Sequence, residues 1–581
     1  MQNLSELNSM NYTANISTPQ RHFLPASFVV SDWNGLHPYF KDLVDREIKS
    51  KQDLEKWLDD VSELEAVVSE DANWRQIRMT CDTENKELEK AFTFFVMEIQ
   101  PHVQSYADKL NRKLIENPFT KELDRGKYFT YLRNIRKNIE LFREENLPLN
   151  SELSVLAQQY GVIAGKMTVQ INGKEYTLQQ ATKFLESPDR NLREEVYRKV
   201  NERRLQDKDE LNKLFTSLVQ KRHQVALNAG FTSYREFRFK ELGRFDYSKE
   251  DCFQFHEAVK QHVMPIANEI YEKKKKKLAL DTLRPWDTEA EPEGIRPLNP
   301  FNTGEELLQK TLSCLDDVNP FFADCLRQMK EMNRLDLESR KGKAPGGYNC
   351  PLPETGAPFI FMNAAGQMGD VTTIIHEGGH AVHSFLTHPL QLTGFKEYPM
   401  EIAEVASMSM ELFSMDYWDA FFDNKDELKR AKEYQLERVI TIFPWIAVID
   451  KFQQWVYENP THTEEQRASQ WMRIVTEFTS PVIDMSGLDD YRRFAWQRQL
   501  HLFEVPFYYI EYGIAQLGAI GLWMQFKQNK QKALDNYIHA LSLGGTKTLP
   551  ELFETAGLKF NFSPDYVSKL MSFVRDEMNK L

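Results

Sequence analysis

The chain contains the stretch Asp370-Val-Thr-Thr-Ile-Ile-His376-Glu377-Gly-Gly-His380-Ala-Val-His-Ser-Phe-Leu386. Its apolar residues recur at helical spacing, and Asp370 is a residue type that often caps a helix, so the pattern predicts a helix over residues 370–386. His376 and His380 are four residues apart and therefore lie on one face of that helix. Two imidazoles in this arrangement, with Glu377 beside the first, predict a zinc site in which the glutamate acts as a general base.

Two adjacent glycines lie between the histidines of this motif. Gly378 and Gly379 each cost a helix about 1 kcal/mol relative to alanine. We interpret the pair as a place where another backbone or a substrate comes close to the helix. The alternative interpretation is a helix whose two histidines are partnered in the protein core.

A catalytic zinc needs a third protein ligand and an open position for water. A second helix is predicted from about Pro399 to Asp419, and Glu401, Glu404 and Glu411 share one of its faces with apolar residues. Buried carboxylates are costly unless they are paired or bound to a metal. The spacing leaves all three glutamates open as the third ligand, and we expect Glu401 to be the one that is solvated.

A second cluster of polar aromatic residues lies downstream, in His501-Leu-Phe-Glu-Val-Pro506-Phe-Tyr508-Tyr509-Ile-Glu-Tyr512. Tyr508 and Tyr512 share one helix face if Pro506 begins that helix. The cluster offers an imidazole and three phenols, which are hydrogen-bond donors of the kind that stabilise an oxyanion. The alternative is that these tyrosines belong to an amphipathic helix in the core.

Residues 340–356 are rich in glycine and proline and predict a loop just before the metal motif. Either this loop contacts a substrate or it is a plain connector. Pro358-Phe-Ile-Phe-Met-Asn363 then predicts one short strand, whose leading proline suits an edge or a first position. An edge strand beside a metal site can hold an extended peptide by main-chain hydrogen bonds, and the alternative is a structural strand of a small sheet.

The composition is that of an ordinary globular protein. The 581 residues allow two to four domains, and glycine and proline, with 25 residues each, are scarce enough to favour helix over sheet. The net charge of −13 argues against a nucleic-acid partner, because phosphate binding needs a basic surface. No stretch approaches the roughly 18 apolar residues of a membrane span, so no membrane association is expected.

Five scattered cysteines without CxxC spacing favour a reducing compartment over a disulfide framework. The first 25 residues lack the pattern of a signal peptide, and we expect a flexible N-terminus and a cytoplasmic protein. Residues 26–190 show long, charged helical patterns. They are interrupted at residues 166–179, where Asn172-Gly173 predicts a two-stranded hairpin with a type I′ turn.

The pattern His376-Glu377-x-x-His380, followed after 23 residues by Glu404-Val-Ala-Ser407, resembles the thimet oligopeptidase and oligoendopeptidase F family of zinc metallopeptidases. The flanking sequences are also similar to that family, namely Gly346-Gly347-Tyr348, Phe359-Ile360-Phe361-Met362-Asn363 and Ala381-Val-His383.

This resemblance implies a mainly helical, two-lobed fold with a deep central channel and a small sheet near the metal. It implies an N-terminal helical region over residues 26–190 and a catalytic domain over residues 191–581. It also implies one Zn²⁺ per chain, held by His376, His380 and Glu404, with Glu377 as the general base.

The resemblance further assigns stabilisation of the oxyanion to His501, Tyr508 and Tyr512. A tyrosine that the thimet-like members carry three residues later is replaced here by Ala515. Glu411 is a candidate for orienting one of the histidines, and His383 is either a packed histidine or a substrate contact. The expected substrate-binding residues are those of the two flanking segments: Gly347, Tyr348, Phe359, Ile360, Phe361 and Met362.

The function implied is endopeptidase action on internal bonds of short unfolded peptides. The alternatives are a peptidyl dipeptidase or carboxypeptidase on the same fold and, as a different class, a non-catalytic peptide-binding protein. Short peptides are the expected partners, and the chain is expected to be a monomer or a small homo-oligomer.

Overall fold

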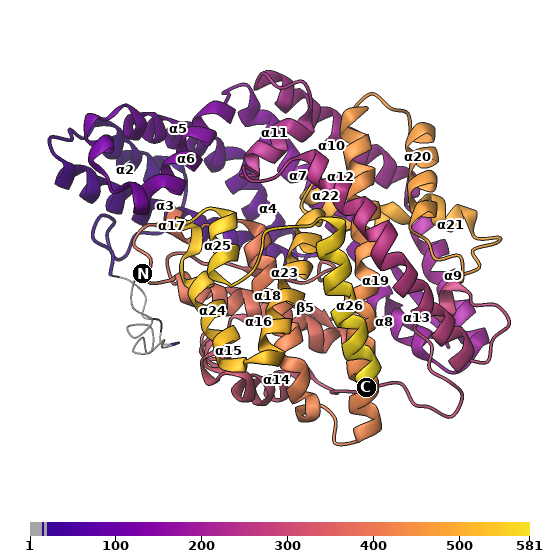
Figure 1. Ribbon diagram of the computed structural model, residues 1–581. Coiled ribbons are helices and arrows are strands. Elements are labelled where there is room, and N and C mark those ends of the chain that lie inside the picture. The colour runs from indigo at the N-terminus through magenta and orange to yellow at the C-terminus, as the bar shows by residue number, and fades with distance from the viewer. Residues whose placement is uncertain (1–13, 15, 17–19) are drawn as a thin grey trace.

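The computed structural model describes residues 14, 16 and 20–581, so the predicted flexible N-terminus lies largely outside the described residues. The fold is mainly helical, as predicted (Figure 1). No helix among the described residues is long and apolar enough to cross a membrane.

The first helices are α2 (Trp33–Asp45), α3 (Lys51–Cys81), α4 (Lys86–Phe94), α5 (Gln100–Glu116), α6 (Arg125–Leu141) and α7 (Asn146–Gly165). Helices α2, α5 and α6 lie at one end of the molecule, whereas α4 and α7 lie closer to its middle (Figure 1). Side-chain caps begin several of them: Asp32 accepts from the Gly35 amide and Ser50 from the Asp53 amide. Residues between 24 and 135 form a hydrophobic cluster of their own, which Leu392 and Phe395 of the later chain join.

The predicted hairpin is confirmed. Strands β1 (Thr168–Ile171) and β2 (Lys174–Thr177) pair antiparallel, with Ile171 opposite Lys174. The turn residues Asn172 and Gly173 have φ angles of 49° and 75°. Positive φ at both central positions is what a type I′ turn requires, and asparagine and glycine adopt it most readily.

A second group of helices leads to the metal motif. It comprises α8 (Leu178–Thr182), α9 (Arg190–Gln206), α10 (Lys208–Asn228), α11 (Tyr234–Glu241), α12 (Lys249–Ala258), α13 (Met264–Lys277), α14 (Gly304–Val318) and α15 (Pro320–Glu331). The C-terminal half adds α16 (Met368–Thr387), α17 (Thr393–Lys396), α18 (Met400–Ser414), α19 (Lys425–Glu458), α20 (Glu464–Glu477), α21 (Asp489–Arg493), α22 (Leu500–Glu504), α23 (Tyr509–Gln528), α24 (Lys530–Ser542), α25 (Leu549–Thr555) and α26 (Pro564–Lys580).

A three-stranded sheet lies beside α16. Its order is β3 (Leu335–Glu338), β5 (Phe359–Ala364) and β4 (Tyr348–Cys350), with β5 parallel to β3 and antiparallel to β4. The predicted strand is therefore present, but an edge position for it is wrong, because β3 and β4 pair with both sides of its backbone. The two edges of this sheet belong to β3 and β4, and β4 arises from the predicted loop.

Helix boundaries also differ from the prediction. The helix that carries the motif begins at Met368, and its N-cap is Gln367. Asp370 lies in the first turn instead, where its carboxylate accepts hydrogen bonds from the backbone amides of Gln367 and Ala365 at 2.8 Å each. The next predicted helix ends as α18 at Ser414 and continues to Ala420 as a 3₁₀ helix.

The centre of the protein is a stack in which α16 packs on α18 and α18 packs on α23. A Cβ atom added at Gly379 would lie 2.5 Å from the Cα of Ser407 and 2.8 Å from the carbonyl oxygen of Ala406. A Cβ at Gly378 would make ordinary contacts with the side chains of Leu326, at 3.5 Å, and Leu315, at 3.9 Å. The predicted close approach of another backbone is thus found at Gly379, and the backbone is that of α18.

Replacing Gly379 with alanine should push α16 and α18 apart and destabilise the protein by about 2 kcal/mol, a typical cost of overpacking. Gly378→Ala is the matched control, since its methyl group makes an ordinary contact and improves helix propensity. Thermal unfolding of both variants measures the effect. Equal melting temperatures for the two variants would contradict the role assigned to Gly379.

Candidate metal centre

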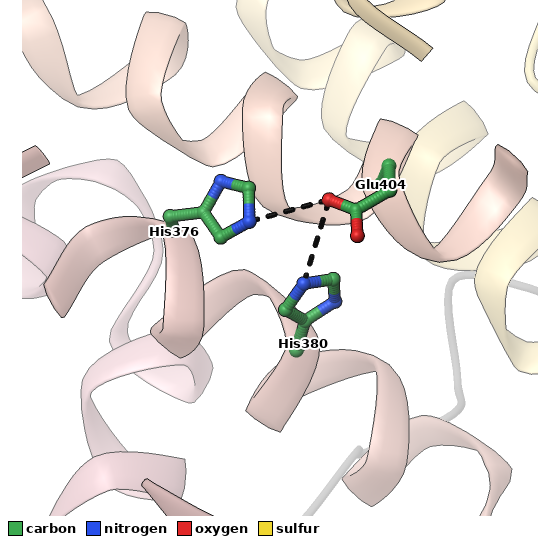
Figure 2. A group of neighbouring side chains, drawn as sticks. All are labelled: His376, His380 and Glu404. Carbon is green, nitrogen blue, oxygen red and sulfur yellow. Dashed lines mark ion pairs between the residues drawn. The ribbon is translucent and has the colours of Figure 1, made fainter. Parts of the chain in front are cut away.

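Two helices bring three potential metal ligands together. Figure 2 shows His376 and His380 of α16 facing the Glu404 carboxylate of α18. Glu404 Oε2 lies 3.2 Å from Nε2 of His376 and 3.6 Å from Nε2 of His380. One donor atom from each of the three residues lies within 4.8 Å of the others. Among the glutamates that spacing left open, the structure selects Glu404.

The electrostatics of these groups reflect burial and mutual attraction. Burial would lower the pKa of His376, but the Glu404 and Glu411 carboxylates outweigh it and raise that pKa well above its usual value. Burial lowers the pKa of His380 to about 4, against the attraction of Glu404. Burial opposes ionisation of Glu404, yet His380 and His376 hold its pKa at about 2. Glu404 is therefore an anion and His380 a neutral imidazole at neutral pH.

The other two glutamates of α18 have different partners. Glu411 Oε1 lies 2.7 Å from Nδ1 of His376, and its Oε2 accepts a hydrogen bond from the Gln435 amide at 2.8 Å. Glu411 thus orients His376 from the side opposite to Glu404. The expectation that Glu401 is solvated is wrong: only 3% of it is exposed, and it accepts a hydrogen bond from the Tyr247 hydroxyl at 2.6 Å.

Glu377 is buried beside the three candidate ligands. Its Oε2 atom has no hydrogen-bond partner among the described residues, and the residue lines a cavity of about 290 Å³. Burial raises the pKa of Glu377 to about 7, with His376 acting against this shift and Glu404 adding to it. A buried carboxylate with a free oxygen and a pKa near neutrality is suited to exchanging a proton with a bound molecule.

The downstream cluster reaches the same site. The Tyr508 hydroxyl donates a hydrogen bond to Glu404 Oε1 at 2.5 Å, so this tyrosine holds the free oxygen of the candidate metal ligand. Tyr512 and His501 line the 290 Å³ cavity, and Tyr512 Oη lies 3.1 Å from His501 Nε2. Tyr508 is not among the residues that line this cavity, which separates its position from that of Tyr512.

A hydrogen-bonded chain fixes the tautomer of His501. The Trp445 indole Nε1, which can only donate, bonds Gln499 Oε1 at 2.8 Å. The amide nitrogen of Gln499 must then be the donor to His501 Nδ1, 2.7 Å away. Burial lowers the pKa of His501 to about 4, so the ring is neutral at pH 7 and its proton lies on Nε2. His501 therefore presents an N–H group towards Tyr512 and the cavity.

The predicted substrate-binding residues divide into two groups. Gly347 lines the 290 Å³ cavity, and a Cβ atom added there would lie 3.6 Å from Glu377 Oε1. Tyr348 stacks on Phe361 with ring centroids 4.7 Å apart and shares a hydrogen bond of 2.6 Å with Thr80. The side chains of Phe359, Ile360, Phe361 and Met362 are buried in the core.

His383 lies apart from the candidate ligands. It is fully buried, and its ring stacks on Tyr398 with centroids 3.5 Å apart. It is not among the residues that line the cavity, which fits a packed histidine and not a substrate contact.

Sequence reasoning missed three residues of the site. Tyr509 and Arg438 line the cavity, and Gln499 orients His501. Tyr509 was visible as one of the three phenols in the cluster, and Gln499 is a polar residue two positions before His501. Arg438 lies on α19, far from either motif, and no local pattern indicates it.

The donor set fits zinc. Two imidazole nitrogens and one carboxylate oxygen are the protein ligands of many catalytic zinc sites, and ligands about 2.1 Å from a tetrahedral ion lie roughly 3.4 Å apart. The separations of 3.2 and 3.6 Å between Glu404 Oε2 and the two imidazole nitrogens bracket that value. The hydrogen bond from His376 to Glu411 is the carboxylate support that metal-binding histidines commonly have.

Comparisons with known proteins identify the family of this chain. Residues 183–572 match the sequence model of Peptidase family M3, and residues 23–142 match that of the Peptidase M3 N-terminal domain. An oligoendopeptidase F homolog of Borreliella burgdorferi is 23% identical over 86% of this chain and 85% of its own length. Oligopeptidase PepF of Bacillus subtilis is 24% identical over 71% of this chain and 60% of its own length.

A solved structure of PZ peptidase A with an inhibitor superposes with a TM-score of 0.91. It is 25% identical in sequence, and the match covers 96% of this chain and 99% of that one. The family match spans more than half of the sequence and contains every candidate metal ligand, so the chain belongs to Peptidase family M3.

Proposed function

We propose that this peptidase is a zinc-dependent oligoendopeptidase that hydrolyses internal bonds of short, unfolded peptides. The observation that carries the proposal is the meeting of His376, His380 and Glu404 beside Glu377, which lines a cavity and has one oxygen without a hydrogen-bond partner among the described residues. A protein that only binds peptides has no need of a buried, unpartnered carboxylate at that place.

His376, His380 and Glu404 would hold one zinc ion, which when bound supplies a Lewis acid that acidifies water and polarises a carbonyl group. Glu377 then accepts the proton of the attacking water and returns it to the leaving amine. The Nε2–H of His501 and the hydroxyl of Tyr512 donate hydrogen bonds to the oxyanion. Tyr508 keeps Glu404 in place through their hydrogen bond.

The free edge of β4 is the best place for the peptide backbone. Gly347 precedes this strand and lies against Glu377, and the Asn349 side chain donates a hydrogen bond of 3.2 Å to the Glu377 carbonyl oxygen. An extended peptide that pairs with β4 would pass the general base in a fixed register. Tyr348 packs on Phe361, so the side chains of β5 support this edge from the core.

The wild-type protein should cleave a peptide of about ten residues that is blocked at both ends, and a chelator should stop cleavage. Glu377→Gln should retain the metal but lower kcat by about 10²- to 10⁴-fold, the usual contribution of a general base. Product mapping by mass spectrometry measures both. Cleavage of unblocked peptides alone would indicate an exopeptidase, and undiminished turnover by Glu377→Gln would refute the general-base role.

Glu404→Ala should weaken zinc binding itself, because it removes one of three ligands. Glu401→Gln is the matched control on the same helix, since Glu401 bonds Tyr247 and lies outside the candidate ligand set. Metal content after dialysis against a weak chelator separates the two variants. Stoichiometric zinc in Glu404→Ala would show that the third ligand lies elsewhere.

The two tyrosines should respond differently to replacement by phenylalanine. Tyr508→Phe frees the Glu404 oxygen and should weaken zinc binding by about 10- to 100-fold, as loss of a ligand's support often does. Tyr512→Phe should keep the metal and lower kcat by about 10²-fold, as loss of an oxyanion donor does. Zinc titration and steady-state kinetics test the pair. If neither replacement has an effect, both tyrosines are packing residues.

A further inference from the structure

A second cavity, of about 560 Å³, adjoins the candidate active site along α19. Thr441 and Trp445 line it, while their helix neighbours Ile442 and Ile446 line the cavity beside Glu377. On the opposite wall, Pro345 belongs to the larger cavity and Gly347 to the smaller one. Helix α19 and the segment from Pro345 to Gly347 therefore line both cavities.

The charged lining of the larger cavity has a single sign. Arg204, Arg492 and Arg498 line it, and none of its described lining residues is an aspartate, a glutamate, a lysine or a histidine. The whole chain has 86 acidic and 73 basic residues, so a cavity without any carboxylate contrasts with the rest of the protein. Such a space attracts anions.

None of these three arginines forms an ion pair with a carboxylate among the described residues. Arg498 lies over the Trp445 ring, 4.3 Å from its centroid. Arg492 donates a hydrogen bond of 3.1 Å to the Thr476 hydroxyl. Arg498 is exposed by surface area, yet burial lowers its pKa, which fits a side chain that opens into an enclosed space.

The energetic cost of placing two cations together is visible in the pKa of Arg204. Burial, with the nearby Arg498 adding to it, lowers the pKa of Arg204 to about 10. Two neighbouring cations with phenols but no acid around them repel each other, and no opposite charge compensates for that repulsion. An anionic ligand that enters the cavity would supply the missing partner.

We propose that Arg204 and Arg498 bind a carboxylate of the peptide that is held for cleavage. This inference rests on the proposed function and adds a substrate class to it: peptides with a carboxylate a short distance from the cut bond. The carboxylate comes either from the free C-terminus or from an acidic side chain, which offer the same chemistry to two guanidinium groups. A volume of about 560 Å³ lies within the range of small-ligand sites.

The remaining walls suit the rest of a peptide. They mix apolar and aromatic side chains, such as Leu185, Val448, Val475, Phe478 and Tyr197, with hydroxyl and amide groups. Apolar side chains can hold the body of a ligand, while polar groups fix its orientation. The arginines would anchor the carboxylate of the peptide in the larger cavity, while Glu377 acts on a peptide bond in the smaller one. They would therefore set the distance between the carboxylate and the cut bond.

The test uses three N-acetylated peptides of one sequence: a free acid, its C-terminal amide, and the amide with glutamate as the last residue. The wild-type protein should cleave the free acid with a kcat/KM about tenfold above that of the plain amide, as expected for a charge-assisted hydrogen bond. Arg204→Gln should remove most of that advantage and leave cleavage of the plain amide within about twofold. Arg498→Gln should likewise lower the ratio of kcat/KM for the free acid to kcat/KM for the plain amide.

Arg575→Gln is the control for loss of one positive charge, since Arg575 forms an exposed ion pair with Glu269. It should leave the ratio unchanged. Binding of the same peptides to Glu377→Gln protein, measured by calorimetry, should show the same preference without turnover. If the glutamate amide regains the advantage, an acidic side chain is a source of the carboxylate; if it does not, the C-terminus is the source.

Equal cleavage of all three peptides by the wild-type protein would overturn the inference. So would an equal loss on all three in Arg204→Gln, because that variant would then act through folding or through the active site. Neither result affects the proposed function, which fails if the wild-type protein cleaves neither of the two amides, since these are blocked at both ends. The two failures are therefore distinguished in one set of measurements.

Discussion

The close approach of α16 and α18 at Gly379 is the constraint on which the site depends. Helices usually pack with axes 8–10 Å apart because side chains separate them. Here a glycine faces the backbone of Ser407 and Ala406, with no room for a Cβ atom. This contact lies one residue before His380 and three residues after Glu404, so it determines how far the carboxylate is from the imidazoles. Gly379 lowers the stability of its helix, but it allows the close approach that sets the distances between the candidate ligands.

Much of the candidate site could be predicted because its chemistry follows local periodicity. The four-residue spacing of His376 and His380 fixes their common helix face whatever the rest of the fold does. Asn172-Gly173 likewise determines its turn through backbone conformations that few other residues adopt. The family resemblance then selected Glu404 from three glutamates that spacing alone could not separate, and the structure places it beside both histidines.

The errors arose where a residue's surroundings come from distant segments. Glu401 was expected to be solvated because nothing near it in sequence shows that Tyr247 covers it. Strand β5 was expected to suit an edge or a first position because of the leading Pro358. Its partners β3 and β4 have only four and three residues and carry no periodic signal that would reveal them. The hydrogen bond from Tyr508 to Glu404 joins residues 104 positions apart. Periodicity describes the face of an element but does not identify what packs against it.

Trp445 has a further consequence, because it lines the larger cavity and is hydrogen-bonded towards the smaller one. Its ring lies beneath the Arg498 guanidinium, and its indole N–H begins the hydrogen-bonded chain that orients His501. A shift of Arg498 would therefore reach the imidazole through Trp445 and Gln499. By thermodynamic linkage, any effect of a ligand at Arg498 on the orientation of His501 equals the effect of that orientation on binding of the ligand. A carboxylate bound at Arg498, as proposed, would thus lie one ring contact and two hydrogen bonds away from the proposed oxyanion donor.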